Sequence, residues 1–307
     1  MQHEMMIVVC GATGQQGSHV VESLLARGRF KVKAFSREPQ SPKGRRLVES
    51  GVLVEQGDLG DVASLTRIFA SAHGVFGVTQ PWSSDYKRVD AAAEIEQGRN
   101  IVDACERAQV GHLVLSTVMT FDDRPTGIPH VDSKLEIERY LFSHAAVRYT
   151  LLRPASFMDN IGAGFFPVKE GRVRGFTDGD AKIPYISCHD IGEAVASAFE
   201  SPDKWQGKAI NLVADYASGE ELCALLAELR SGRKFRYSAP PALLMRIFAP
   251  EFYKMRRSFE QAGRPPFPYQ VGIDQAMTAT RELISGPRNL ERHLAAQGFA
   301  TRTLTKS

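Results

Sequence analysis

The chain has 307 residues, of which 24% are charged and 43% hydrophobic, a profile typical of one large folded domain or of a large and a small one. The formal net charge is only +3, so the charge balance gives no reason to expect a nucleic-acid partner. No apolar stretch reaches the roughly 20 residues of a membrane span, and the four cysteines are scattered with no C-x-x-C spacing. We therefore expect a cytoplasmic protein without a membrane segment and without a metal site.

Three glycines separate the first predicted strand from the first predicted helix. The apolar run 7–10 predicts a short buried strand, and apolar residues recur at helical spacing over 15–27. This geometry holds a dinucleotide pyrophosphate, because glycine lets the backbone approach the phosphates and a helix N-terminus offers N–H groups. The alternative is a tight turn that is merely rich in glycine. The predicted cofactor contacts here are Gly11, Thr13, Gly14, Gln15, Gln16 and Gly17.

Apolar runs alternate with amphipathic stretches along the first half of the chain. The further predicted strands cover 30–35, 52–55, 74–78, 112–116 and 148–152. The further predicted helices cover 43–50, 61–72, 87–109 and 131–144. This alternation predicts an α/β fold, a Rossmann-type doubly wound parallel sheet with helices on both faces and right-handed crossovers. We assign it to residues 1–154.

The pattern changes after Pro154, and residues 155–307 are predicted to form a smaller, mostly helical substrate or lid region. One strand near 208–213 is predicted to return to the main sheet. The predicted helices cover 190–200, 218–230, 241–262 and 288–297. The stretch 241–262 mixes apolar and basic residues as an interfacial membrane helix does. However, Pro250 interrupts it and its apolar positions do not hold one face, which favours a lid or packing helix.

The residues after the second predicted strand favour NADP over NAD. Sites that prefer NAD often place an acidic residue at this point, where it accepts a hydrogen bond from the ribose 2′-hydroxyl. Here the strand is followed by Ser36 and Arg37, and an arginine can pair bidentately with a 2′-phosphate. Lys43, Arg45 and Arg46 follow in the same basic stretch. The alternative interpretation of this stretch is a solvated basic face.

Polar residues follow three more predicted strands at the edge of the sheet where ligands bind. Asp58 and Leu59 are predicted to meet the adenine, although Asp58 could instead cap the helix that begins at residue 61. Thr79 and Gln80 follow the fourth strand, and Ser116 ends the fifth. Because the carboxyl ends of parallel strands meet at one edge, we predict that these residues contact the cofactor as well.

Five segments of the chain, taken together, resemble the NmrA-like branch of the short-chain dehydrogenase/reductase superfamily. They are GATGQQG (11–17), SR (36–37), QGDL (56–59), HVDSK (130–134) and RPASFMDN (153–160), and they occur in the order typical of that branch. The resemblance implies a Rossmann domain, a small C-terminal domain that closes over a cleft, and NADP(H) as the cofactor.

The same resemblance implies roles for two residues of the segment 130–134. Most of the superfamily uses a Tyr-x-x-x-Lys pair, and here His130 replaces the tyrosine while Lys134 is retained. Lys134 would hold the nicotinamide ribose and act in catalysis, with His130 as proton donor. Alternatively, His130 merely begins a helix and Lys134 is an exposed cation one turn from Glu138. The resemblance also places Phe157 and Asn160 beside the nicotinamide, where the alternatives are a core residue and a turn residue.

Two functions of different classes follow from these predictions. The first is an NADPH-dependent oxidoreductase that reduces a small apolar acceptor such as a quinone or an enone. The second is a non-catalytic NADP(H)-sensing regulator of the NmrA type, which would engage a protein partner or a second copy of the chain as a homodimer. In the first case, C-terminal residues would line an apolar substrate pocket, although they could equally be core residues. These residues are Phe165, Phe166, Met245, Phe248, Phe252 and Tyr253.

Overall fold

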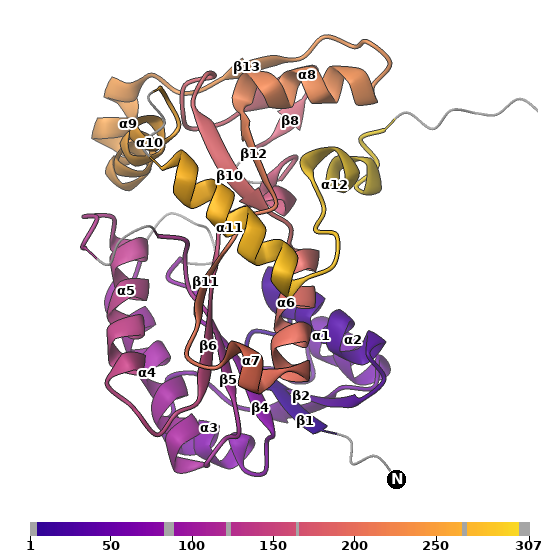
Figure 1. Cartoon of the computed structure of the whole chain (residues 1–307), viewed down its shortest axis with the longest axis vertical. Coiled ribbons are helices and arrows are strands. Elements are labelled where there is room, and N and C mark those ends of the chain that lie inside the picture. The colour runs from indigo at the N-terminus through magenta and orange to yellow at the C-terminus, as the bar shows by residue number, and fades with distance from the viewer. Residues whose placement is uncertain (1–4, 83–88, 121–123, 164–165, 266–268, 301–307) are drawn as a thin grey trace, which may run out of the picture. The chain divides into compact units, whose positions relative to one another are not determined.

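The structure is a computed structural model that describes residues 5–82, 89–120, 124–163, 166–265 and 269–300 (Figure 1). The chain divides into two compact units, Met1–Pro154 with Cys188–Asn211, and Ala155–Ser187 with Leu212–Ser307. The sequence analysis placed 188–211 in the second region, apart from the returning strand, whereas the structure groups this segment with the first unit. Within the described residues, every helix is too short or too polar to cross a membrane.

The described part of the first unit is built on a seven-stranded sheet of order β11-β6-β5-β4-β1-β2-β3. Its strands are β1 Met5–Val9, β2 Phe30–Ser36, β3 Leu53–Gln56, β4 Gly74–Val78, β5 Leu113–Ser116, β6 Tyr149–Pro154 and β11 Ala209–Leu212. All pairings from β3 through to β6 are parallel. The strand order reverses between β1 and β4, which is the position where sheets of this kind bind ligands. The predicted Rossmann-type fold class is confirmed.

Helices cover both faces of this sheet. They are α1 Gln15–Ala26, α2 Pro42–Glu49, α3 Val62–Phe69, α4 Ala91–Arg107, α5 Pro129–Phe142, α6 Cys188–Glu200 and α7 Pro202–Trp205. Two glycines of β4 show the two faces, because residues three apart in a strand point to opposite sides. A Cβ on Gly74 would meet Phe199 of α6, whereas a Cβ on Gly77 would meet Ile101 of α4. The side chains of α3, α4 and α5 form one continuous core with the sheet.

The second unit combines short strands with helices. Its strands are β7 Ser156–Phe157, β8 Val168–Lys169, β9 Arg172–Arg174, β10 Lys182–Ile186, β12 Asp215–Ser218 and β13 Arg236–Ser238. They form two small sheets, β12-β10-β7 and β13-β9-β8, which the sequence analysis did not predict. The helices are η1 Met158–Asn160 (a 3₁₀ helix), α8 Gly219–Leu229, α9 Ala242–Phe248, α10 Pro250–Ala262, α11 Gln270–Leu283 and α12 Leu290–Ala296. Pro250 opens α10, so the predicted helix 241–262 is two helices.

Candidate functional site

The glycine turn joins the end of β1 to the start of α1, and each glycine has a structural reason. Gly11 adopts a φ of +63°, a left-handed conformation that glycine reaches without strain. The N–H of Gly14 donates to the carbonyl oxygen of Gly11 at 2.8 Å and closes the turn. A Cβ on Gly17 would lie 2.1 Å from that same oxygen. Only glycine therefore fits where the first turn of α1 passes over the loop.

The N-terminus of α1 fits an anionic ligand. Gly14 is the N-cap residue, and none of the described side chains caps this helix. Gly14 and Gln15 are exposed, while Thr13 and Gln16 are half-buried. The hydroxyl of Ser116, at the end of β5, donates to Oε1 of Gln16 at 2.7 Å and ties the helix to the sheet. A helix N-terminus without a side-chain cap, preceded by a close backbone turn, is a suitable place for a pyrophosphate.

The end of β2 carries an exposed basic residue. Arg37 directly follows the last residue of this strand and is exposed. The N–H of Glu38 donates to Oγ of Ser36 at 3.1 Å and shapes the turn that leaves the strand. Three further exposed cations lie on α2: Lys43, Arg45 and Arg46. The surface beside β2 is therefore basic over the stretch that the sequence analysis assigned to a 2′-phosphate.

The loop after β3 shows that Asp58 is not the N-cap of the following helix, which was one alternative from the sequence. The N-cap of α3 is Asp61, whose carboxylate accepts from two N–H groups of the first turn. Asp58 does not cap the helix; its carboxylate accepts from the N–H of Gly60 at 2.8 Å within the preceding turn, and it is exposed. The carbonyl oxygen of Leu59 accepts from the amide of Asn100 at 2.9 Å. Helix capping is therefore no longer an alternative to the predicted contact of Asp58 with the cofactor.

Lys134 is the centre of a buried polar cluster at the carboxyl end of β4. Its ammonium donates to the carbonyl oxygen of Thr79 at 2.9 Å and to the Thr79 hydroxyl at 2.7 Å, and it lies 2.7 Å from Oε1 of Glu94. The hydroxyls of Thr79 and Ser133 also donate to the Glu94 carboxylate. Lys134 is 7% and Glu94 1% exposed. The alternative that Lys134 is an exposed cation beside Glu138 is wrong.

Glu94 was not among the site residues predicted from the sequence, although the apolar pattern of its helix contains a signal for it. The buried positions of α4 include Gly98, Ile101, Val102 and Cys105, and Glu94 continues this same stripe toward the N-terminus of the helix. A carboxylate on the apolar stripe of an amphipathic helix needs a buried partner, because burial of an unpaired charge is costly. The periodicity of 87–109 could therefore have predicted a buried partner for Glu94, but not which residue it is.

A second buried carboxylate holds α5 against the sheet. Glu138 is 2% exposed and pairs with the guanidinium of Arg153, near the end of β6. It also accepts from the hydroxyl of Thr117, which follows β5, at 2.5 Å. Glu138 is thus occupied by partners on the sheet, which leaves Glu94 as the carboxylate that pairs with Lys134.

His130 lies one helical turn before Lys134, as the second residue of α5. It is half-buried, and its ring centroid lies 5.4 Å from that of Trp82, in the loop after β4. Gln80, in the same loop, is exposed. The helix therefore brings an imidazole and an ammonium to the loop that follows β4.

Phe157 and Asn160 belong to the second unit. Phe157 lies in β7, and Asn160 ends the helix η1, where its carbonyl oxygen accepts from the N–H of Phe166 at 3.3 Å. Both side chains are half-buried. Their predicted place beside the nicotinamide stays a prediction.

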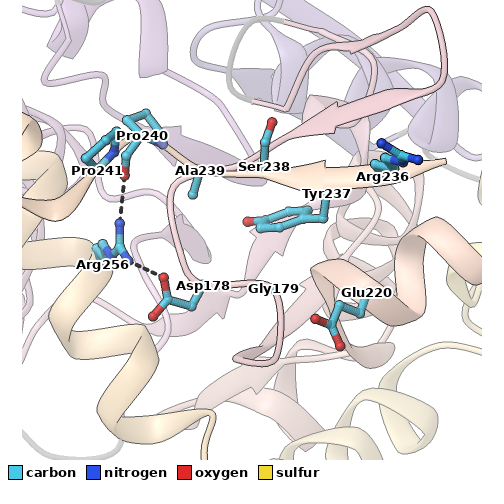
Figure 2. A pocket seen from close by; sticks show the side chains of 10 residues that line it. All are labelled: Asp178, Gly179, Glu220, Arg236, Tyr237, Ser238, Ala239, Pro240, Pro241 and Arg256. Carbon is cyan, nitrogen blue, oxygen red and sulfur yellow. Dashed lines mark hydrogen bonds and ion pairs between the residues drawn. The ribbon is translucent and has the colours of Figure 1, made fainter.

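The second unit contains a cavity of about 550 Å³ that is lined by both polar and apolar groups (Figure 2). The ring of Tyr237 projects into it between Glu220 and the pair formed by Asp178 and Arg256. None of the five described residues that were predicted to line an apolar pocket lines this cavity. Phe166 and Met245 are buried, Phe248 is exposed, and Phe165 lies outside the described residues. The cavity is lined by Asp178, Gly179, Glu220, Arg236, Tyr237, Ser238, Ala239, Pro240, Pro241 and Arg256.

The parallel sheet, its switch point and the glycine turn define a Rossmann-type NAD(P)-binding fold. The chain belongs to the NmrA-like family, whose sequence profile matches residues 3–294. A protein of Aspergillus flavus named NmrA-like family domain-containing oxidoreductase lnbB is 31% identical over 262 residues, which cover 78% of this chain and 77% of that protein.

Two solved structures show the same fold at low sequence identity. The negative transcriptional regulator NmrA is 22% identical with a TM-score of 0.77, over 97% of this chain and 96% of that one. NmrA has also been solved with NAD and with NADP. The NADPH-dependent quinone oxidoreductase QOR2 of Escherichia coli, solved with NADPH, is 24% identical with a TM-score of 0.73, over 95% and 100% of the two chains. Solved proteins of this fold thus include both an oxidoreductase and a regulator.

Proposed function

We propose that this chain is an NADPH-dependent oxidoreductase that reduces a small apolar acceptor such as a quinone or an enone. The observation that carries the proposal is the ammonium of Lys134, which Thr79 and Glu94 hold at the carboxyl end of β4. The neighbouring strand β1 leads into the glycine turn, so both features belong to the same edge of the parallel sheet. The oxidoreductase names of the relatives support the same conclusion.

Different residues at this edge would hold different parts of the cofactor. The turn 11–17 would hold the pyrophosphate, and Arg37 would pair with the 2′-phosphate. Asp58 and Leu59 would meet the adenine, and the nicotinamide half would lie toward Gln80 and Ser116. When bound, NADPH supplies the hydride that reduces the acceptor.

Lys134 and His130 would have different roles, the first in binding the cofactor and the second in protonating the acceptor. Glu94 neutralises the charge of Lys134, so we assign Lys134 to binding the nicotinamide ribose, whose hydroxyl would replace one of the three contacts that the ammonium makes with Thr79 and Glu94. Each reduced acceptor takes up one hydride and one proton. His130, one turn earlier on α5, would donate that proton, since imidazole is the side chain that exchanges protons near neutral pH. A quinone needs little acid catalysis, because its reduction yields a stabilised phenolate.

A non-catalytic NADP(H) sensor is the second candidate, and two features of the site favour it. All three donors of the Lys134 ammonium are directed at Thr79 and Glu94, and the superfamily's tyrosine is replaced by His130. The similarity to NmrA, which is described as a negative transcriptional regulator, fits this candidate as well.

The two candidates differ in turnover. Purified protein is mixed with NADPH and with each of several quinones and enones, and NADPH absorbance is followed with time. A reductase consumes NADPH only when an acceptor is present. His130→Gln should slow the acceptor-dependent consumption of NADPH. Lys169→Gln, a control at an exposed strand residue, should leave it unchanged. If NADPH binds but no acceptor causes its consumption, the reductase proposal fails and the sensor replaces it.

A further inference from the structure

The helix α9 presents a cluster of large apolar side chains to solvent. Leu243 is 67%, Leu244 49%, Ile247 61% and Phe248 80% exposed. These four, which we call the α9 apolar face, account for four of the nine exposed large hydrophobic residues in the described part of the chain. Single exposed apolar residues are common on proteins, but a contiguous group of this size on one short helix indicates an interaction surface.

The four side chains share one side of the helix. At about 100° per residue, Leu243 to Phe248 place these four within an arc of roughly 140°, and Met245 lies outside that arc. Met245 is 5% exposed and faces the body of the second unit. The apolar positions failed to share a face over 241–262 because that stretch is two helices; within α9 alone they do share one.

Buried contacts hold α9 in place from its other side. The guanidinium of Arg256, on α10, donates to the carbonyl oxygen of Pro240 at 2.8 Å and lies 3.8 Å from the sulfur of Met245. Arg256 is itself fixed by Glu260 and Asp178. The apolar face is therefore a fixed feature of the second unit.

The exposed charges of α9 and of the following helix α10 are of one sign. Every exposed charged residue of α9 and α10 is a cation, namely Arg246, Lys254 or Arg257. The acidic residues of the same helices, Glu251 and Glu260, are only half-exposed. Pairing this face with the same face of a second copy would bring like charges together, so the charge pattern favours an anionic partner.

We propose that the α9 apolar face, with Arg246, Lys254 and Arg257, docks this protein on the surface of an anionic lipid bilayer. Leu, Ile and Phe beside Arg and Lys form the composition of segments that lie in the membrane interface. A bilayer needs no preformed complementary groove, and it accepts side chains that project from the surface, as Phe248 and Leu243 do. The binding is peripheral and uses lipid headgroups for the cations and the acyl boundary for the apolar residues.

Sedimentation with lipid vesicles tests the proposal on the full chain. Wild type should bind vesicles of phosphatidylcholine and phosphatidylserine at least about tenfold more strongly than vesicles of phosphatidylcholine alone, and added salt should weaken this binding. Leu243→Ser with Phe248→Ser should lower the binding about tenfold or more. Arg246→Gln should lower it about fivefold, the effect of one cation near such a surface.

Val271→Ser is the matched control, because Val271 is 70% exposed on α11 of the same unit. It should bind as wild type does, and circular dichroism should show all variants folded. Wild type that stays in solution with both vesicle types overturns the proposal, as does a Leu243→Ser, Phe248→Ser variant that binds normally. A dimer in sedimentation velocity that only this double variant disrupts would instead assign the face to a second copy. Vesicle binding is measured without turnover, so its failure leaves the reductase proposal standing.

Discussion

At the scale of single residues, Glu94 and Lys134 form a buried pair of opposite charges at the edge of the sheet. Removing one partner leaves the other charge uncompensated, which typically costs about 3–5 kcal/mol. Glu94→Gln should therefore lower the free energy of unfolding by about 3 kcal/mol in urea titrations, because the amide keeps some of the hydrogen bonds. Glu96→Gln, an exposed position on the same helix, should change it by less than about 0.5 kcal/mol.

The pair also predicts strong coupling between its two members. Glu94→Gln with Lys134→Met removes both charges, so this double variant should lose less stability than the sum of the two single variants, by about 1 kcal/mol or more. Simple additivity of the two losses would mean that the ion pair does not form in solution.

His112 makes stability depend on pH. Its Nε2 lies 2.8 Å from the Thr150 hydroxyl, which donates to the carbonyl of Trp205, so Nε2 carries the proton and donates. Its Nδ1 is buried and has no hydrogen-bond partner among the described residues. Burial, aided by the nearby Arg148 charge, lowers the pKa of His112 from 6.5 to about 4.

Because the pKa of His112 is lower in the folded chain than in the unfolded one, the unfolded chain takes up a proton first as the pH falls. The contribution of His112 is fully present above pH 6.5 and is lost as the pH falls to about 4, for a total of about 3 kcal/mol. Urea unfolding across this range should show a flatter pH dependence of stability for His112→Gln than for wild type. Parallel curves for wild type and His112→Gln would refute this assignment.

Arg37 is predicted to decide which dinucleotide binds. Arg37→Glu replaces a partner of the 2′-phosphate by a like charge, so the dissociation constant for NADPH should rise roughly 100-fold. NADH lacks that phosphate, and its dissociation constant should change by less than about threefold. Calorimetric titration of both cofactors measures this, with Arg107→Glu as an exposed control on α4. An equal loss for both cofactors would remove the assignment of Arg37 to the 2′-phosphate.

At the scale of elements, the crossing of α1 over the glycine turn sets the geometry of the cofactor site. A methyl group at position 17 would lie 2.1 Å from a backbone oxygen, which no side-chain rotation relieves. Gly17→Ala should therefore shift α1, weaken dinucleotide binding at least about tenfold, and cost about 2 kcal/mol of stability. Gly28→Asn is the control, since nothing lies within 4 Å of a Cβ there and asparagine tolerates its φ of +64°. Normal binding by Gly17→Ala would show that the turn does not hold the phosphates.

Most elements of the first unit could be predicted because apolar runs alternate there with amphipathic stretches, whereas the four-residue helix α7 was not predicted. The second unit shows where this fails: β7 and β8 have two residues each, which is too short for any alternation to appear. Pro250 was recognised as an interruption of 241–262, but the sequence did not show that a second helix begins at this proline. The same limit applies to the site. The glycine turn could be predicted because its residues are neighbours in the sequence, whereas the contact between Glu94 and Lys134 joins two helices that are distant in the sequence.

At the scale of the molecule, the parallel sheet gathers separate sequence segments at one edge. The glycine turn follows β1, Thr79 follows β4 and Ser116 ends β5, and these three strands are neighbours. The bond from Ser116 to Gln16 and the bonds from Lys134 to Thr79 link this edge to α1 and α5. The topology thus explains why motifs spread over more than a hundred residues can serve one ligand.

The most direct test of the account is the rate of NADPH oxidation at saturating quinone in two proteins. Wild type is compared with Glu94→Gln, Lys134→Met, which removes the ammonium without leaving an unpaired carboxylate. We predict acceptor-dependent NADPH oxidation by wild type. The double variant should remain folded and should lose about 100-fold or more in kcat/KM for NADPH. Equal rates in the two proteins would contradict the central role of Lys134.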